Sequence, residues 1–144
     1  MRRVLPVVIA LGLWTCSPAA VPAPRTAPST QAAAPAASPN STLGGVYTVD
    51  QATRGRNIYL GQCRSCHNPS TGDAFERLWG GKTVADLFTY IHESMPPNDP
   101  GSLSRTDNAD VVSFLLQATG LPAGTHGLSS DRDSLKAIRI EVKK

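Results

Sequence analysis

Two cysteines and a histidine lie together in the segment Cys63-Arg64-Ser65-Cys66-His67. The cysteines are three residues apart, which is about one turn of a helix, so their thiols can reach the two vinyl groups of one porphyrin. His67 follows directly, and its imidazole can then bind the iron as the proximal ligand. This pattern indicates covalent attachment of one c-type haem.

A Cys-x-x-Cys pair has two other uses. It can form a redox-active disulfide, which needs a βαβ context, or half of a zinc site, which needs further Cys or His at close spacing. The sequence around Cys63 and Cys66 shows neither context. Both uses remain as alternatives to haem attachment.

The sixth ligand of a haem iron would come from the end of a predicted helix. This helix starts at Thr83, which with Asp86 resembles a capping box, and it stops at Met95, because two prolines follow. A thioether on such a proline-braced loop is a good axial ligand and raises the reduction potential. His92 and His126 compete for the role, but we expect both of these side chains to be exposed.

Two more helices are expected from their end signals and apolar spacing. The first has Asp50 as its N-cap and Gly61 just beyond its end, and Gly55 inside it suggests that another backbone packs closely there. The last opens with the capping-box-like segment Ser104–Asp107 and ends at Gly120.

The segment Asn68–Gly81 is predicted as a loop or a short helical stretch. It carries three large apolar side chains, Phe75, Leu78 and Trp79, and the haem is the surface that they would cover. The indole N–H of Trp79 either donates to a haem propionate or the ring packs in the core. Residues 121–144 form a loop and a short piece whose secondary structure the pattern leaves open.

The N-terminal residues 1–16 resemble a signal peptide. Arg2 and Arg3 are followed by an apolar run, Val4–Trp14, which is too short to span a bilayer permanently as a helix. The predicted location is therefore periplasmic or extracellular. This agrees with haem attachment, which in bacteria takes place outside the inner membrane.

Cys16 is left over once the haem is accounted for. Either it is the lipidated cysteine of a lipoprotein and tethers the chain to the membrane, or the signal peptide is cleaved after Ser17-Pro18-Ala19. Residues 17–45 are rich in Pro, Ala, Ser and Thr, which predicts a disordered linker and slightly favours the anchor. Residues 46–144 remain as the one globular domain.

The formal net charge of +3 does not indicate a nucleic-acid partner. From Val46 onward there are 11 Lys plus Arg and 11 Asp plus Glu, so the whole excess comes from Arg2, Arg3 and Arg25. No basic stripe with interleaved aromatic residues is present.

With these pieces assembled, residues 46–140 resemble class I cytochromes c, specifically the short haem domains found with bacterial dehydrogenases and in haem-copper oxidase third subunits. Besides the Cys-x-x-Cys-His segment, the motifs that carry the resemblance are Arg54-Gly55-x-x-x-Tyr59, Trp79-Gly80-Gly81, Met95-Pro96-Pro97-x-x-Pro100-Gly101 and Asp110–Leu116. The resemblance implies an all-α cytochrome c class I fold, with three to four helices around one covalently bound haem.

The resemblance also implies that the first and last helices cross at Gly55, with Tyr59 against Phe114. Members usually carry a Gly-Pro-x-Leu segment whose carbonyl accepts the Nδ1–H of the haem-binding histidine, and this chain lacks it. We expect the acceptor for His67 to be a backbone carbonyl between Asn68 and Gly80.

The function implied is a periplasmic electron carrier, not an enzyme. Cys63 and Cys66 hold the ring, His67 and Met95 bind the iron, and the redox partners are a dehydrogenase and a respiratory acceptor such as a terminal oxidase. Two alternatives stay open: a catalytic or gas-sensing haem protein with a labile sixth position, and a fixed haem subunit of a dehydrogenase complex.

Overall fold

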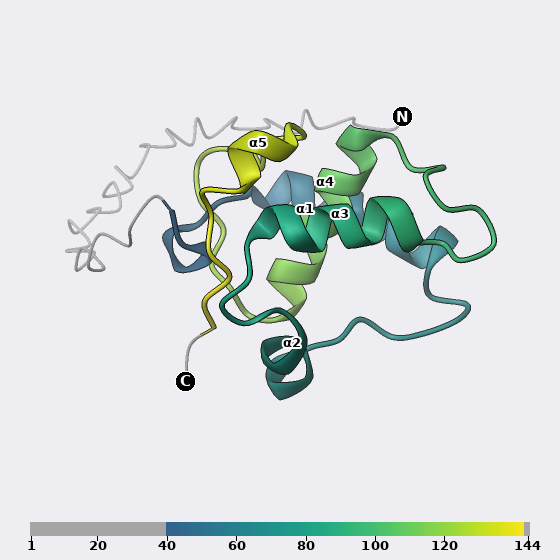
Figure 1. Ribbon diagram of the computed structural model, residues 1–144, viewed down its shortest axis with the longest axis horizontal. Coiled ribbons are helices and arrows are strands. Elements are labelled where there is room, and N and C mark those ends of the chain that lie inside the picture. The colour runs from purple at the N-terminus through teal and green to yellow at the C-terminus, as the bar shows by residue number, and fades with distance from the viewer. Residues whose placement is uncertain (1–39, 143–144) are drawn as a thin grey trace, which may run out of the picture. The chain divides into compact units, whose positions relative to one another are not determined.

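The computed structural model describes residues 40–142 (Figure 1). The expected signal peptide at 1–16, the candidate lipidation site at Cys16 and the linker up to residue 39 lie outside the described residues. Residues 40–142 form helices and no strand, which confirms the all-α class. The elements are η1 (Thr42–Gly44), α1 (Val49–Gln62), α2 (Gly72–Trp79), α3 (Val84–Ser94), α4 (Arg105–Ala118) and α5 (Arg132–Leu135). None of these helices is long and apolar enough to cross a membrane.

Helix α1 begins at Val49, and its N-cap is Thr48 rather than the predicted Asp50. Thr48 has an extended backbone, and its hydroxyl accepts a hydrogen bond from the N–H of Gln51 at 3.2 Å. This bond satisfies one of the free N–H groups at the helix start. Asp50 instead lies in the first turn, where a carboxylate is favoured by the helix dipole.

The end of α1 also differs from the prediction. The helix continues through Gly61 to Gln62, and Cys63 caps it with an N–H that bonds the carbonyl of Tyr59 at 2.9 Å. Gly61 has no positive φ, and no atom outside the local backbone lies within 4 Å of the position that a Cβ on it would take, so it is an ordinary glycine within the helix. The first cysteine of the motif therefore sits directly on the end of α1.

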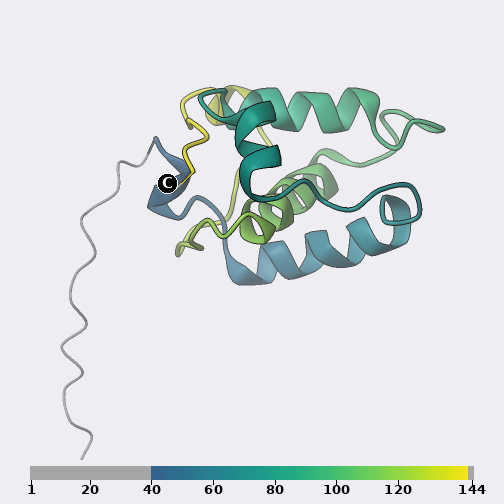
Figure 2. The same ribbon diagram turned by 90° about the horizontal axis from the view of Figure 1, so that it is seen from below.

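Helices α1 and α4 cross in close contact, as predicted (Figure 2). A Cβ built on Gly55 would lie 1.8 Å from the carbonyl oxygen of Asp110, so only glycine permits this approach. One turn further along, the rings of Tyr59 and Phe114 pack with centroids 5.2 Å apart. Arg54 adds two hydrogen bonds, of 2.7 and 3.0 Å, to the buried carboxylate of Asp110.

Helix α3 has both of its predicted ends. Thr83 and Asp86 form a complete capping box, and Met95 is the C-cap residue. The predicted apolar face of α3 is buried, and Phe88 accepts through its carbonyl a hydrogen bond from the Asn108 side chain of α4 at 2.8 Å. Met95 is therefore placed by a helix that is packed against the core.

The C-terminal residues form a short helix, α5, and then an extended segment. The segment Ile138–Glu141 lies between the start of the described chain and the loop before α3. Ile138 accepts from Val84 N–H, and Ile140 exchanges hydrogen bonds with Gly81 and Lys82, each at 2.9 Å. This backbone pairing holds the Gly81–Val84 loop in place.

Residues 40–45 differ from the linker that we expected to continue to residue 45. Thr42 is fully buried, its N–H bonds the carbonyl of Arg139 at 3.0 Å, and its hydroxyl bonds the carbonyl of Glu141 at 2.8 Å. Ser41 also donates a hydrogen bond to the Glu141 carboxylate. The composition of this segment gave no sign of that pairing, because backbone hydrogen bonds carry no apolar pattern.

Candidate haem-binding site

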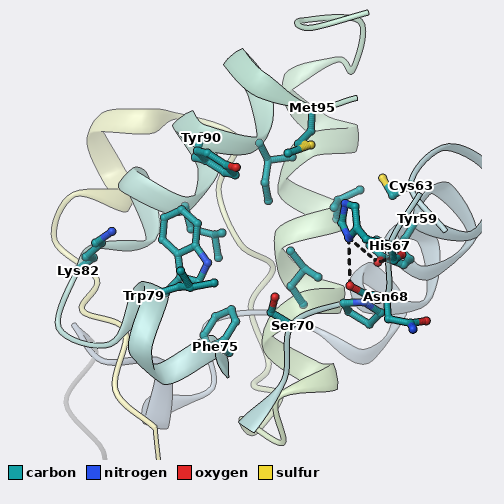
Figure 3. A pocket seen from close by; sticks show the side chains of 16 residues that line it. Tyr59, Cys63, His67, Asn68, Ser70, Phe75, Trp79, Lys82, Tyr90 and Met95 are labelled. Atoms are coloured by element: carbon teal, nitrogen blue, oxygen red, sulfur yellow. Dashed lines mark hydrogen bonds between the residues drawn. The ribbon is translucent and has the colours of Figure 1, made fainter. Parts of the chain in front are cut away.

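A cavity of about 500 Å³ opens between α1, α2, α3 and α4. Its size lies in the ordinary range for a small-molecule or cofactor pocket. Most of the side chains around it are apolar, and they come from α1 to α4 and from the segment that joins α1 to α2 (Figure 3). The lining residues are Tyr59, Cys63, His67, Asn68, Pro69, Ser70, Phe75, Leu78, Trp79, Lys82, Leu87, Tyr90, Ile91, Met95, Val111 and Leu115.

Both cysteines of the motif are free thiols. Cys63 is buried and lines the cavity, whereas Cys66 is exposed and borders a small hollow that it shares with Cys63, His67 and Met95. Burial, and secondly the neighbouring Cys66, raises the pKa of the Cys63 thiol. Within residues 40–142 there is no cluster of three or more His, Cys, Asp or Glu side chains that could hold a metal ion, so a zinc site gains no support.

His67 faces the cavity with one ring nitrogen already engaged. Its Nδ1 lies 3.0 Å from the carbonyl oxygen of Asn68 and 3.3 Å from the hydroxyl oxygen of Tyr59. The Tyr59 hydroxyl donates its own proton to the carbonyl of His67 at 2.8 Å. Asn68 falls within the range in which we expected the acceptor.

These contacts decide which nitrogen of His67 carries the proton. A carbonyl oxygen can only accept, and the Tyr59 hydroxyl has committed its one proton elsewhere, so both neighbours of Nδ1 require an N–H there. The neutral ring then has its lone pair on Nε2, which is the atom that is free to bind a metal. Burial raises the pKa of Tyr59, so its hydroxyl stays protonated at neutral pH.

Met95 is half-buried at the end of α3 and lines the same cavity as His67. Figure 3 shows the thioether of Met95 and the imidazole of His67 facing the same space. His92 and His126 do not line the cavity. His126 is exposed as expected, but His92 is half-buried, stacks on Phe88 and has an Nδ1 without a hydrogen-bond partner.

Trp79 lines the end of the cavity away from Cys63 and is half-buried (Figure 3). Its ring packs on Tyr90 with centroids 5.3 Å apart, and the ammonium group of Lys82 lies 4.8 Å from the ring centroid. Lys82 is the one Lys, Arg, Asp or Glu among the described lining residues. A cation and an indole N–H at this end suit the carboxylates of a haem.

Among the lining residues that the sequence-based site did not include, three make polar or cationic contacts at the site: Tyr59, Asn68 and Lys82. Tyr59 was recognised only as a packing residue, because its position on the apolar face of α1 says nothing of where its hydroxyl reaches. The Asn68 contact is made by a backbone carbonyl, which no side-chain pattern reveals. Lys82 directly follows the Trp79-Gly80-Gly81 motif, and this position was the one sequence signal that could have placed it at the site.

The residues present fit a haem. The cavity is apolar, it receives an imidazole with a free Nε2 and a thioether, and two free thiols lie beside it. When bound, haem supplies an iron that changes between ferric and ferrous states by one electron. The crossing of α1 with α4 and the Cys-x-x-Cys-His segment at the end of α1 place this domain among the class I cytochromes c.

The comparison with protein families agrees. The model of the family described as cytochrome C oxidase, cbb3-type, subunit III matches residues 50–115, from the first turn of α1 into α4. Residues 50–115 are therefore a class I cytochrome c domain, and such a domain binds haem and transfers electrons through it. Neither the curated proteins nor the solved structures that were compared match this chain.

Proposed function

We propose that this protein is a periplasmic electron carrier with one covalently bound c-type haem, held by His67 and Met95 as axial ligands. Cys63 and Cys66 form the two thioethers, and Trp79 donates to a propionate. The observation that carries the proposal is the placement of His67, with Nε2 free, and Met95 on one apolar cavity. With both axial positions filled, the iron exchanges electrons without binding a substrate.

The lining of the cavity favours a carrier over a catalytic or gas-sensing protein. Among the described lining residues there is no Asp or Glu, so no carboxylate is available as a general acid or base. Met95 belongs to the C-cap of a helix that is anchored by a capping box at its other end. A ligand held in this way is not readily displaced.

The redox partners that we propose are a dehydrogenase as the electron donor and a respiratory acceptor such as a terminal oxidase. The apolar side chains Leu78 and Tyr90, which are 53% and 47% exposed, border the cavity and offer a docking surface beside the haem. Purification of the native protein with whatever enzyme holds it would identify the partner. A permanent, stoichiometric association would favour the fixed-subunit alternative.

The axial ligands are tested by spectroscopy of Met95→Ala beside His126→Ala. We expect a low-spin ferric wild type with a Met-to-iron charge-transfer band and slow cyanide binding. Met95→Ala should lose the band, bind cyanide rapidly and have a lower reduction potential, because a ligand that favours ferrous iron is gone. His126→Ala, whose side chain lies outside the cavity, should resemble the wild type. A high-spin wild type would favour the catalytic or gas-sensing alternative.

Covalent attachment is tested by acid-acetone extraction of the denatured protein. Haem should stay on the wild-type polypeptide and pass into the organic phase from the variant Cys63→Ser/Cys66→Ser. Complete extraction from the wild type would contradict a c-type haem. Fractionation of cells, compared between the wild type and Cys16→Ser, tests the location and the lipid anchor.

A further inference from the structure

The hydroxyl of Tyr59 contacts both the backbone and the ring of a single residue, His67. It donates to the His67 carbonyl oxygen at 2.8 Å, and its oxygen lies 3.3 Å from Nδ1 of the same residue. The two rings meet edge to face, with centroids 6.0 Å apart and planes at 76°. Tyr59 is only 2% exposed, so these bonds are shielded from water on the tyrosine side, although His67 itself is exposed.

The two acceptors of the Nδ1–H differ in how they are held. Asn68 follows His67 in the chain and is exposed, so its carbonyl moves with the loop that carries the histidine. Tyr59 instead belongs to α1, and its ring packs on Phe114 of α4. The close crossing at Gly55 fixes this part of α1 against α4. Tyr59 is therefore the contact that ties the imidazole to the helical core.

We propose that the Tyr59 hydroxyl is a positioning group for His67, which fixes the plane of the imidazole and lowers the reduction potential. The proposal rests on the proposed ligation of the iron by His67. An acceptor on the second ring nitrogen makes a ligating imidazole more basic. A more basic ligand favours the ferric over the ferrous state, so each acceptor on Nδ1–H shifts the equilibrium toward oxidation.

The chain offers a matched pair of variants for the test. Tyr59→Phe keeps the ring against Phe114 and removes only the hydroxyl. Tyr47→Phe is the control, because Tyr47 is 1% exposed, donates to the carbonyl of Leu121 at 2.6 Å and does not line the cavity. Each variant loses one buried hydroxyl bond to a backbone carbonyl, but only Tyr59→Phe alters the surroundings of His67.

Reduction potentials are measured on the haem-loaded proteins by redox titration, after the low-spin spectrum of each has been recorded. We expect the equilibrium constant for reduction to rise about threefold in Tyr59→Phe, equivalent to about 30 mV for a one-electron couple, and to stay unchanged in Tyr47→Phe. Proton NMR of the ferric proteins gives a second readout. The haem methyl shifts, which depend on the plane of the axial imidazole, should change only in Tyr59→Phe.

The outcomes distinguish failure of the positioning role of Tyr59 from failure of the proposed function. Unchanged potential and methyl shifts in Tyr59→Phe, with a low-spin spectrum retained, would refute the positioning role and leave the proposed function intact. Equal changes in both variants would also refute it, because they would show a general effect of lost hydroxyl bonds. A wild type without histidine ligation would refute the proposed function itself.

Discussion

The haem-free chain should not be stably folded. The cavity of about 500 Å³ lies within the only core that the described helices share. Cavities in protein cores cost about 24 cal/mol per Å³, so an empty space of this volume costs about 12 kcal/mol. A typical domain is stable by about 5–15 kcal/mol in total. Water can fill the open side of the cavity, but even half of the cost, about 6 kcal/mol, is as large as the whole stability of a domain at the lower end of that range.

This prediction is tested with the variant Cys63→Ser/Cys66→Ser, from which any non-covalently bound haem is removed by extraction. We expect no near-ultraviolet circular dichroism of a packed core and no cooperative urea transition, whereas the haem-loaded wild type should unfold in one step. Haem is then added back to the extracted variant as the control for irreversible damage. It should restore part of the near-ultraviolet circular dichroism. A cooperative transition of the haem-free chain, with a slope like that of the wild type, would refute the reasoning.

Two further predictions concern the frame around the site. Gly55→Ala should destabilise the haem-loaded protein by about 3 kcal/mol, because the new Cβ meets the Asp110 carbonyl. Gly61→Ala in the same helix should be neutral or stabilising by about 0.5–1 kcal/mol, and equal urea midpoints of the two variants would contradict the close crossing. Asp86→Asn should cost about 0.5–1 kcal/mol at pH 6. Hydrogen bonds from Thr83 lower the pKa of Asp86 below its ordinary 3.8, so its contribution is present above that value and is lost as the pH falls through the lowered pKa. Urea titrations of both proteins should therefore converge in acid, and a constant difference would argue against the ionised cap.

The parts of the fold that could be predicted from the sequence depend on local or periodic signals. The helix around Met95 has a capping box and a proline stop, and both of its ends were right. Gly55 inside an otherwise regular helix correctly indicated a close backbone approach. The ends of α1 were each misplaced by two residues. At the start, Thr48 and Asp50 are both acceptable caps and only the backbone conformation distinguishes them.

The parts that could not be predicted depend on contacts between distant residues. The pairing of Thr42 with Arg139 and Glu141 joins the two ends of the described chain through backbone and hydroxyl bonds. Such bonds require no particular residue type, so no sequence pattern predicts them. The same holds at the site, where Tyr59 was recognised as an aromatic packing residue while its hydroxyl bonds to His67 were not.

The structure also bears on the order in which haem attachment and folding take place. In the folded arrangement Cys63 is buried, and its raised pKa keeps the thiol protonated at neutral pH. A protonated thiol is a poor nucleophile. Haem is the group against which the cavity-lining side chains of α1, α2, α3 and α4 would pack. If the haem is covalently bound as proposed, we expect the thioethers to form before the helices pack, and the bound haem then to supply the surface on which they pack.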